Sequence, residues 1–445
     1  MTVEDDRAVV DALVDAVEFC YDQEWTDGLP VVPCTPERLD AFLAHTDRAP
    51  DEVLLAMPQI GRECTVRMAA LNAAMAGCRP EYLPVVLAVW DSLNAEGYTG
   101  KGIWQSTTGT APLILVNGPV RAELGVNSRG NVFGSGFRAN ATIGRAIRLA
   151  AINVFGLRPH ALDQATQGTP AKYTCCIGEN QEESPWPAFH EEFGFGPDDS
   201  TVTAMTMRSV SQIEARHTSD ARQLLRDFAG TVARTGALLQ RTISTCLVLS
   251  PEHAHLLAGQ GFDKPAIREF VFEAAQLSRE ELDAVGKTAI SSTTSWRLPS
   301  DHPEAVPDER VDPATDFFHV LTSPDAVQVV VAGASNSGVS AVVDTFGPRG
   351  DRPPLVAVPR PGAAGRADPQ DLRGPLGGIV ATLERDGFAP TWDVTASGDL
   401  TFRIGAGSAD CSECLVPKSM IEAMLTDALA GTSYRVAEVV MPTEG

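Results

Sequence analysis

The pattern of apolar and polar positions along the chain has two periods, which predict a structure of mixed helices and strands. Apolar residues recur every three or four positions over residues 5–21, which predicts an amphipathic helix. Short apolar runs between turn residues predict buried strands at 111–116 and 327–332. The pattern over 211–241 is typical of a pair of helices. We therefore expect a large α/β domain of mixed α+β character.

Capping residues mark several helix starts. Thr35 is followed by Pro36, and Ser250 is followed by Pro251, which is the order expected of an N-cap residue and a first helical residue. Thr65 is a third candidate cap, before a helix of small residues. The buried flank of that helix would include Asn72, which we name as a polar group that could face a ligand or join two helices.

The last 70 residues have a pattern of their own. It predicts a helix over 376–385, strands over 391–394 and 400–404, a helix over 417–430 and a strand over 434–441. The predicted order is α-β-β-α-β. Cys411 and Cys414 stand just before the second helix.

A CxxC pair at a helix start can be reactive. The positive end of the helix dipole stabilises a thiolate and lowers the pKa of a cysteine there. Metals, iron–sulfur clusters and disulfide exchange all require thiolates. We therefore name Cys411 and Cys414 as candidate catalytic residues and candidate metal ligands.

The same stretch resembles the C-terminal scaffold domain of NifU, the Nfu-type module. The resemblance rests on these pieces: Leu383 with Asp386-Gly387, Gly398-Asp399-Leu400, Cys411 with Cys414, and Ser419 with Ile421-Glu422. Ser412 and Glu413 stand where that family usually has glycines. The resemblance implies an iron–sulfur cluster or a single metal ion at Cys411 and Cys414.

Length and charge set the outer limits of the interpretation. A chain of 445 residues is longer than one core normally supports, so we expect more than one domain. We place a large domain at 1–347, with a possible internal boundary near 200–210, a Pro- and Gly-rich linker at 348–371 and a CxxC domain at 372–445. The net charge of −23 argues against nucleic acid or an anionic membrane as a partner. An acidic N-terminus, no apolar run of membrane-spanning length and nine scattered cysteines favour a cytoplasmic protein with reduced thiols.

A glycine-rich stretch at 125–145 is a candidate anion site. Its glycines would let backbone N–H groups approach a ligand, a helix starts near its end, and three arginines lie within it. The candidate substrate-binding residues are Asn127, Arg129, Asn131, Arg138, Asn140, Thr142 and Arg145, together with Asn72 and Lys172 from outside the stretch. A long ordered loop whose arginines pair with acids is the alternative.

A second group of candidates lies at 163–190. Cys175 and Cys176 fall in a strand-like run, so their side chains should point to opposite faces. A nucleophilic thiol needs a basic or cationic neighbour, and the candidates are Lys172, Glu179 and His190. Two small buried hydrophobic residues are the alternative.

Residues 20–350 also resemble a bacterial family that we associate with UGSC-type (seleno)protein domains. The matching pieces are Asp27 to Pro33, Ala74 to Tyr82, Arg138 to Arg145, and Ala165 to Gly168 through Glu179-Asn180 to Trp186. The UGSC motif itself is absent. The resemblance implies no particular catalytic residues, and an association with thiol or selenol chemistry would fit the C-terminal tail.

Together these features favour a cysteine- or metal-dependent lyase or transferase. We expect a small carboxylate or phosphate substrate, C–S bond formation or cleavage or sulfur transfer, and a sulfur donor or thiol reductant protein as partner. Two alternatives remain at this point: an iron–sulfur carrier or assembly protein, and a metal-dependent lyase or hydrolase with cysteine ligands. A homo-oligomer is expected.

Overall fold

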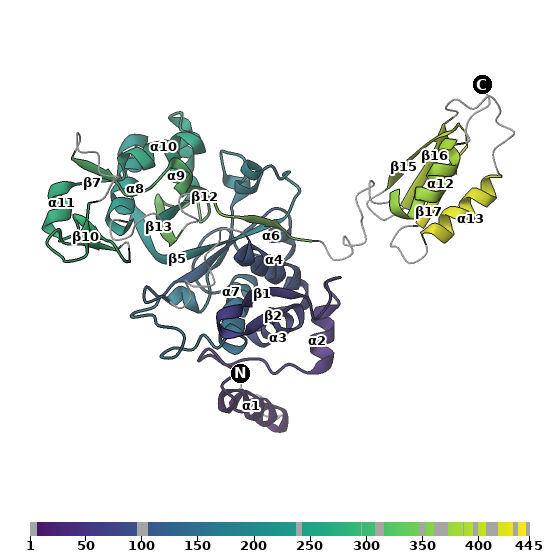
Figure 1. Cartoon of the computed structure of the whole chain (residues 1–445), viewed down its shortest axis with the longest axis horizontal. Coiled ribbons are helices and arrows are strands. Elements are labelled where there is room, and N and C mark those ends of the chain that lie inside the picture. The colour runs from purple at the N-terminus through teal and green to yellow at the C-terminus, as the bar shows by residue number, and fades with distance from the viewer. Residues whose placement is uncertain are drawn as a thin grey trace. The chain divides into compact units, whose positions relative to one another are not determined.

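A computed structural model describes residues 7–95, 106–236, 243–294, 296–307, 316–346, 352–359, 373–385, 387–394, 399–405, 417–429 and 435–441 (Figure 1). The chain forms two compact units, residues 1–358 and 359–445. Among the described residues no helix is both long and apolar enough to cross a membrane.

A seven-stranded sheet is the centre of the large unit. Its strands are β3 (Ala111–Asn117), β4 (Cys176–Gly178), β5 (Thr201–Glu214), β6 (Ile243–Leu249), β12 (Val327–Val331), β13 (Val339–Phe346) and β14 (Leu355–Ala357). The order across the sheet is β12-β6-β13-β5-β3-β4, and β14 pairs with the start of β5.

The two halves of this sheet have the same plan. In each half two parallel strands are followed along the chain by a third that runs antiparallel: β3, β4 and β5 in the first, and β6, β12 and β13 in the second. The third strands, β5 and β13, pair antiparallel at the middle of the sheet. This is the order that a two-fold axis between β5 and β13 would produce.

The sheet curls around an apolar interior. Six strands or the residues beside them contribute to one buried cluster, which includes Leu113, Leu115, Cys175, Ile177, Met205, Met207, Cys246, Val248, Val330, Ala341 and Val343. The intervening residues, such as Ile114 and Val116 of β3, pack on the other face, as the two-residue period of a strand requires. The Asn180 N–H, just after β4, donates to the Val331 oxygen of β12 at 2.7 Å and so links the two edges.

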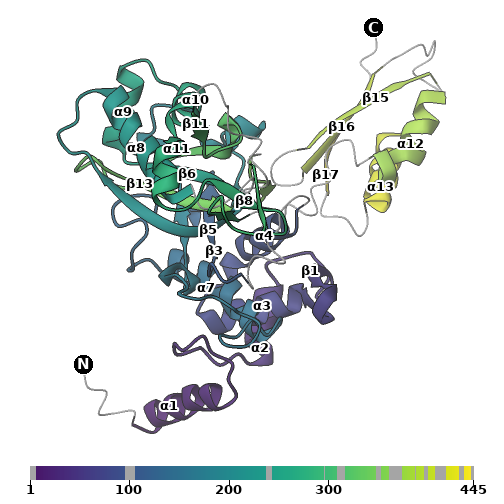
Figure 2. The same ribbon diagram turned by 60° about the vertical axis from the view of Figure 1, so that its left-hand side comes forward.

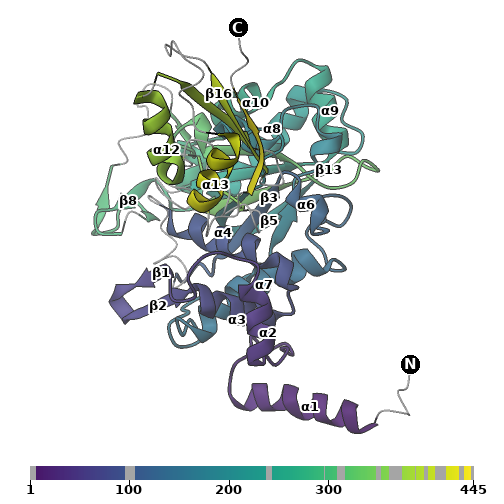
Figure 3. The same ribbon diagram turned by 90° about the vertical axis from the view of Figure 1, so that its right-hand side faces the viewer.

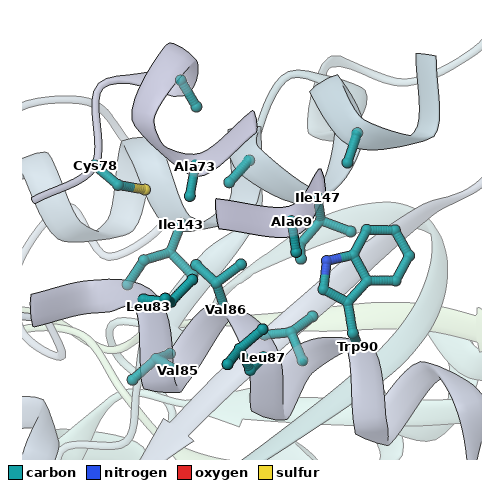
Figure 4. Close-up of a cluster of buried hydrophobic side chains, with 14 of the residues drawn as sticks. Ala69, Ala73, Cys78, Leu83, Val85, Val86, Leu87, Trp90, Ile143 and Ile147 are labelled. Atoms are coloured by element: carbon teal, nitrogen blue, oxygen red, sulfur yellow. The ribbon is translucent and has the colours of Figure 1, made fainter. Parts of the chain in front are cut away.

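Two groups of helices cover the outside of the sheet, as the three ribbon views show (Figures 1, 2 and 3). The first group is α3 (Val66–Ala76), α4 (Leu83–Asn94) and α7 (Arg138–Asn153), and the second is α8 (Ala221–Gly236), α9 (Pro251–Gly259) and α10 (Lys264–Ala274). Figure 4 shows the first core, where Trp90 of α4 lies beside small and branched side chains of α3 and α7.

The remaining elements of the large unit are helix α1 and a set of shorter helices and strands. They are α1 (Arg7–Asp22), α2 (Pro36–Leu43), β1 (Val53–Met57), β2 (Arg62–Thr65), α6 (Val120–Glu123), β7 (Gln276–Ser278), α11 (Arg279–Ala284), β8 (Ala289–Ser291), β9 (Arg297–Leu298), β10 (Ala305–Val306) and β11 (Phe317–His319), with 3₁₀ turns between them. The three predicted caps are confirmed, since the hydroxyls of Thr35, Thr65 and Ser250 each accept a backbone N–H of the first helical turn.

The structure differs from the sequence prediction at two places. Residues 211–214, predicted to be helical, are the end of β5, and α8 is the only helix among the described residues of the predicted helical pair. The segment pairs antiparallel with β13, and Ile213 packs against the second helix group, so long-range contacts hold it extended. The strand β14 lies within the stretch predicted to be a linker, yet it pairs with β5 and belongs to the large unit.

The small unit has the predicted order of elements. It consists of α12 (Arg373–Arg385), β15 (Ala389–Val394), β16 (Asp399–Gly405), α13 (Lys418–Ala428) and β17 (Arg435–Val440). β16 is central, antiparallel to β15 and parallel to β17. Its Leu400 and Phe402 pack against Leu376 of α12 and Leu425 of α13. Cys411 and Cys414 lie outside the described residues.

Candidate functional site

A cavity of about 990 Å³ opens beside helix α7. We call it the 158–173 cavity after the loop that forms most of its wall. Its lining residues are Glu24, Thr26, Asp27 and Gly28 from the turn after α1, Arg148 and Ile152 from α7, and Arg158, Pro159, His160, Asp163, Gln164, Ala165, Thr166, Gln167, Gly168, Thr169, Pro170, Lys172 and Tyr173 from the loop. Polar and charged groups from three separate segments therefore meet in one place.

Two cations in this wall share one carboxylate. The Lys172 amine contacts both oxygens of Asp163, at 2.8 and 2.6 Å, and the Arg148 guanidinium contacts one of them at 2.6 Å. The side chain of Asp163 is 2% exposed and that of Lys172 is 15% exposed. Asp163 is thus enclosed, whereas the Lys172 side chain is slightly exposed and lines the cavity.

The pKa values in this cluster follow from burial and from its charges. Burial alone would raise the pKa of Asp163, but hydrogen bonds from Lys172, from the Ala165 N–H and from Arg148 outweigh it and hold the pKa below the ordinary value. Desolvation lowers the pKa of Lys172, and the positive charge of Arg148 acts in the same direction, while Asp163 opposes both. The net result is a lysine that loses its proton more readily than an exposed one.

Backbone packing fixes the loop that carries these residues. Gly109 and Gly168 both have left-handed backbone conformations, and a Cβ on Gly109 would lie 2.6 Å from the Gly168 Cα. The Thr166 N–H donates to the Thr107 oxygen at 2.9 Å. Glycine is required at this close approach, and the loop is thereby held against the start of β3.

Two further basic groups line the cavity. Arg158 donates to the Glu24 backbone oxygen at 2.6 Å, and its guanidinium lies 3.7 Å from the Glu24 carboxylate. Its side chain remains 37% exposed. His160 has a φ of +64°, a left-handed conformation that residues other than glycine rarely adopt.

Arg145 supports the cavity from behind. Its guanidinium pairs with Asp27 at 2.7 Å and donates to the Leu29 and Pro30 oxygens. The Asp27 side chain is 3% exposed, so this is a buried pair that fixes the turn after α1. From the sequence we expect Arg145 to bind substrate directly, but its hydrogen bonds here are to Asp27 and to backbone oxygens of the protein.

The other polar side chains of the 125–145 stretch also serve the backbone. Asn140 accepts from the Asn127 N–H at 2.7 Å and donates to the Cys176 oxygen at 2.8 Å. Asn127 donates to the Gly130 oxygen, Asn131 to the Ser135 oxygen, and Thr142 to the Arg138 oxygen. Substrate binding by these residues stays a prediction, and the alternative of an ordered loop accounts for the contacts they make.

Three more predicted binders lie apart from the 158–173 cavity wall. Arg129 is 62% exposed and lies 3.8 Å from Glu183, and Arg138 donates to the Gly77 oxygen at 3.0 Å. Asn72 is buried, where it donates to the Met68 oxygen and accepts from Asn153. Asn72 therefore joins α3 to α7, which is the structural role that the sequence left open.

The adjacent cysteines point to opposite sides of β4, as predicted. Cys175 belongs to the interior of the sheet, and Cys176 packs under the first helix group. Burial raises the pKa of Cys175 to about 12 and raises that of Cys176 as well, with the neighbouring thiols adding to the effect. Neither thiol lines the 158–173 cavity.

Two of the three partners predicted for these thiols, Glu179 and His190, are buried in other networks. Glu179 accepts from the Phe189 N–H at 2.7 Å and from Asn117, and its carboxylate lies 3.6 Å from the Lys264 amine. Burial raises the pKa of Glu179. His190 contacts the Gly196 oxygen at 3.0 Å, and burial lowers its pKa. Their catalytic roles stay predictions.

Lys172 is a candidate from the sequence, but its neighbours Arg148, Arg158, His160 and Asp163 are not. Arg148 comes three positions after Arg145, and this helical spacing was a signal that the two arginines project on the same side. Among the described residues no group of three or more His, Cys, Asp or Glu side chains is placed to hold a metal ion. The predicted ligands Cys411 and Cys414 lie outside that part of the chain.

No family model matches the chain, and neither a curated protein nor a solved structure matches it significantly.

Proposed function

We propose that this chain is an enzyme that binds a small anionic substrate in the 158–173 cavity. The observation that carries the proposal is the cluster of Arg148, Asp163 and Lys172, which brings two cations and one carboxylate to a cavity large enough for a small metabolite. A perturbed lysine in a polar cavity is typical of a catalytic site.

The charges of the wall favour an anion. Arg148 and Lys172 carry two positive charges against the single negative charge of Asp163. The Glu24 carboxylate, which also lines the cavity, is 74% exposed and lies 3.7 Å from the Arg158 guanidinium. Asp27 is neutralised by Arg145, which lies behind the wall. Arg158 adds a guanidinium that is partly open to solvent, and guanidinium groups bind carboxylates and phosphates through two parallel hydrogen bonds.

The reaction that we propose for this substrate is C–S bond formation or cleavage, or sulfur transfer. The tail would supply a thiolate, a persulfide or a metal centre from Cys411 and Cys414. The α-β-β-α-β order of the small unit is the order expected from the resemblance to the NifU C-terminal domain. A cavity lined by ionised groups favours an enzyme over an iron–sulfur carrier, which needs a docking surface instead.

Calorimetric titration of the full chain with oxalate and with inorganic phosphate tests the binding site. We expect saturable binding of at least one anion and weakening of about 10- to 100-fold in Arg158→Gln, because a charge-assisted hydrogen bond contributes roughly 1.5–3 kcal/mol. Arg279→Gln is the matched control, since Arg279 pairs with Asp316 at an exposed position.

Two outcomes overturn the assignment of the cavity. One is that neither anion binds to the wild-type chain. The other is that Arg129→Gln abolishes binding while Arg158→Gln leaves it unchanged, which would move the anion site to the 125–145 stretch.

A further inference from the structure

We infer, resting on the proposed function, that Lys172 is a covalent catalytic residue whose amine forms an imine with the carbonyl carbon of a small oxo acid held in the 158–173 cavity. The inference assigns to the site a class of substrate, an aldehyde or ketone that also carries a carboxylate. It also assigns a chemical role to one side chain.

The position of Lys172 suits this role. Its amine lies at the wall of the cavity, and the side chain is neither fully buried nor free in solvent, at 15% exposed. The carboxylate of Asp163 holds the amine through both oxygens. A nucleophile must be presented to the substrate in one orientation, and this contact restricts the rotation of a long, flexible side chain.

Burial and the charge of Arg148 favour the neutral amine that the chemistry needs, while Asp163 favours the ammonium form. One carboxylate, Asp163, faces both Arg148 and Lys172. Arginine keeps its proton in proteins, so the lysine is the member of this pair that can lose one. Desolvation and the Arg148 charge lower the pKa of Lys172 accordingly. A neighbouring cation is one of the known ways to activate a lysine nucleophile.

The other described lysines lack this combination. The chain has five lysines in all. Lys264 is 3% exposed and is held by Glu179, Glu192 and the Pro187 oxygen. Lys287 contacts the Arg297 oxygen at 3.5 Å, and Lys418 is a surface residue, 50% exposed, near Glu422. None of these three lines the 158–173 cavity.

The covalent step balances without any further reagent. The Lys172 ammonium group loses one proton to solvent, and the freed nitrogen lone pair attacks the carbonyl carbon. A C–N bond forms, the C=O π bond breaks, and one proton passes from the nitrogen to the oxygen. The resulting hydroxyl takes up the proton first released and leaves as water, so one ammonium ion and one carbonyl compound give one protonated imine and one water. The protonated imine withdraws electrons from the adjacent carbon, which is the reason enzymes use it to make or break bonds there.

Reductive trapping of the full-length chain tests the inference. The chain is incubated with low concentrations of glyoxylate and sodium cyanoborohydride, which supplies the hydride that converts an imine into a stable secondary amine. Peptide mapping by mass spectrometry then compares the rates of modification at Lys172, Lys287 and Lys418. We expect Lys172 to react at least tenfold faster than Lys418 and to remain reactive at a lower pH than Lys418 does. Oxalate should protect Lys172 from modification. Oxalate is the matched competitor because it carries carboxylates but no aldehyde.

Lys172→Arg separates chemistry from folding. It keeps the positive charge beside Asp163 but cannot form the imine. We expect this variant to lose the adduct on the 158–173 loop and to unfold at the wild-type temperature. Lys418→Arg is the matched control, and it should leave the trapping at Lys172 unchanged.

The outcomes distinguish this inference from the proposed function. Modification of Lys172 no faster than that of Lys418 overturns the inference, and oxalate binding in the same preparation then leaves the anion site standing. Selective trapping at Lys172 without oxalate binding supports the covalent role of Lys172 and overturns the proposal that the cavity binds an anion. Failure of both trapping and binding overturns both proposals.

Discussion

At the scale of single residues, surroundings decide what a reactive type of side chain can do. Cys175 and Lys172 are three positions apart, and both are chemically able to act as nucleophiles. Cys175 points into an apolar interior that raises its pKa to about 12, while Lys172 stands beside Arg148 in a polar cavity that lowers its pKa. Lys172 therefore lines the cavity, while Cys175 lies in the apolar interior of the sheet.

The thiols of Cys175 and Cys176 should be inert in the native chain. With a pKa near 12, Cys175 has about one thiolate in ten thousand molecules at pH 8, and the thiolate is the nucleophile. We expect neither to be alkylated by iodoacetamide over hours at pH 8, and both to react within minutes in guanidinium chloride. Mass spectrometry of the alkylated peptides measures this, and rapid native alkylation of either would return that cysteine to the list of catalytic candidates.

Much of the candidate site is not readable from local sequence because three distant segments form it. Lys172 could be predicted as a site residue because polar residues are concentrated around it in the sequence. Arg158 and Asp163 could not be joined to Arg148, since the turn after α1, helix α7 and the 158–173 loop meet only in the folded chain. The reverse holds for Asn127 and Asn140: their residue types are typical of a ligand site, but their amide groups complete the backbone hydrogen bonding of an ordered loop.

At the scale of elements, the sequence predicts best where period and cap agree. The helices that begin after Thr35 and Ser250 start where predicted, and the five elements of the small unit appear in the predicted order. The end of β5 was missed because 211–214 alternates polar residues with one isoleucine. Four residues cannot separate a two-residue period from a helical one, and the long-range pairing with β13 decides the conformation.

Helix α7 crosses the start of β4 at Gly144, and this contact sets the position of the loop carrying Lys172. A Cβ on Gly144 would come within 3.0 Å of the Cys175 nitrogen and still closer to the Thr174 hydroxyl. We expect Gly144→Ala to destabilise the large unit by about 1–3 kcal/mol because the added methyl group overpacks the crossing. Denaturant unfolding monitored by circular dichroism gives the free energy.

Gly230 provides the matched control on helix α8. It is an exposed helical glycine, and a Cβ there would meet nothing within 4 Å. Gly230→Ala should therefore stabilise the chain by up to about 1 kcal/mol, since alanine is the better helix former. An equal effect of the two substitutions would show that the α7 crossing is not tightly packed.

At the scale of the whole molecule, the large unit extends past the boundary that composition indicates. The Pro354 oxygen accepts hydrogen bonds from Ser92 of α4 and Thr203 of β5, at 3.2 and 2.8 Å, and β14 follows it directly. The proline and arginine content of this region is typical of a linker. The region nevertheless contains β14, which continues the sheet. Composition alone does not distinguish an edge strand from a connection.

Two truncations test this boundary. A fragment of residues 1–359 should be soluble and unfold cooperatively at the same temperature as the large unit of the full chain, because it keeps every strand of the sheet. A fragment of residues 1–347 should unfold several degrees lower, since it leaves the Ser92 and Thr203 hydroxyls without their acceptor and the start of β5 without β14. Scanning calorimetry compares them. Identical midpoints would show that β14 contributes nothing to the fold.

The mirrored order of the sheet bears on the ancestry of the chain. Two copies of one strand-helix-strand-strand unit, associated about a two-fold axis, would place their last strands together just as β5 and β13 lie. Joining the copies into one polypeptide by gene duplication would then have freed each to diverge. Residues of the first copy, Arg148, Asp163 and Lys172, could be acquired without a counterpart in the second. A present-day relative that contains only one half, and that dimerises, would be the surviving record of that ancestor.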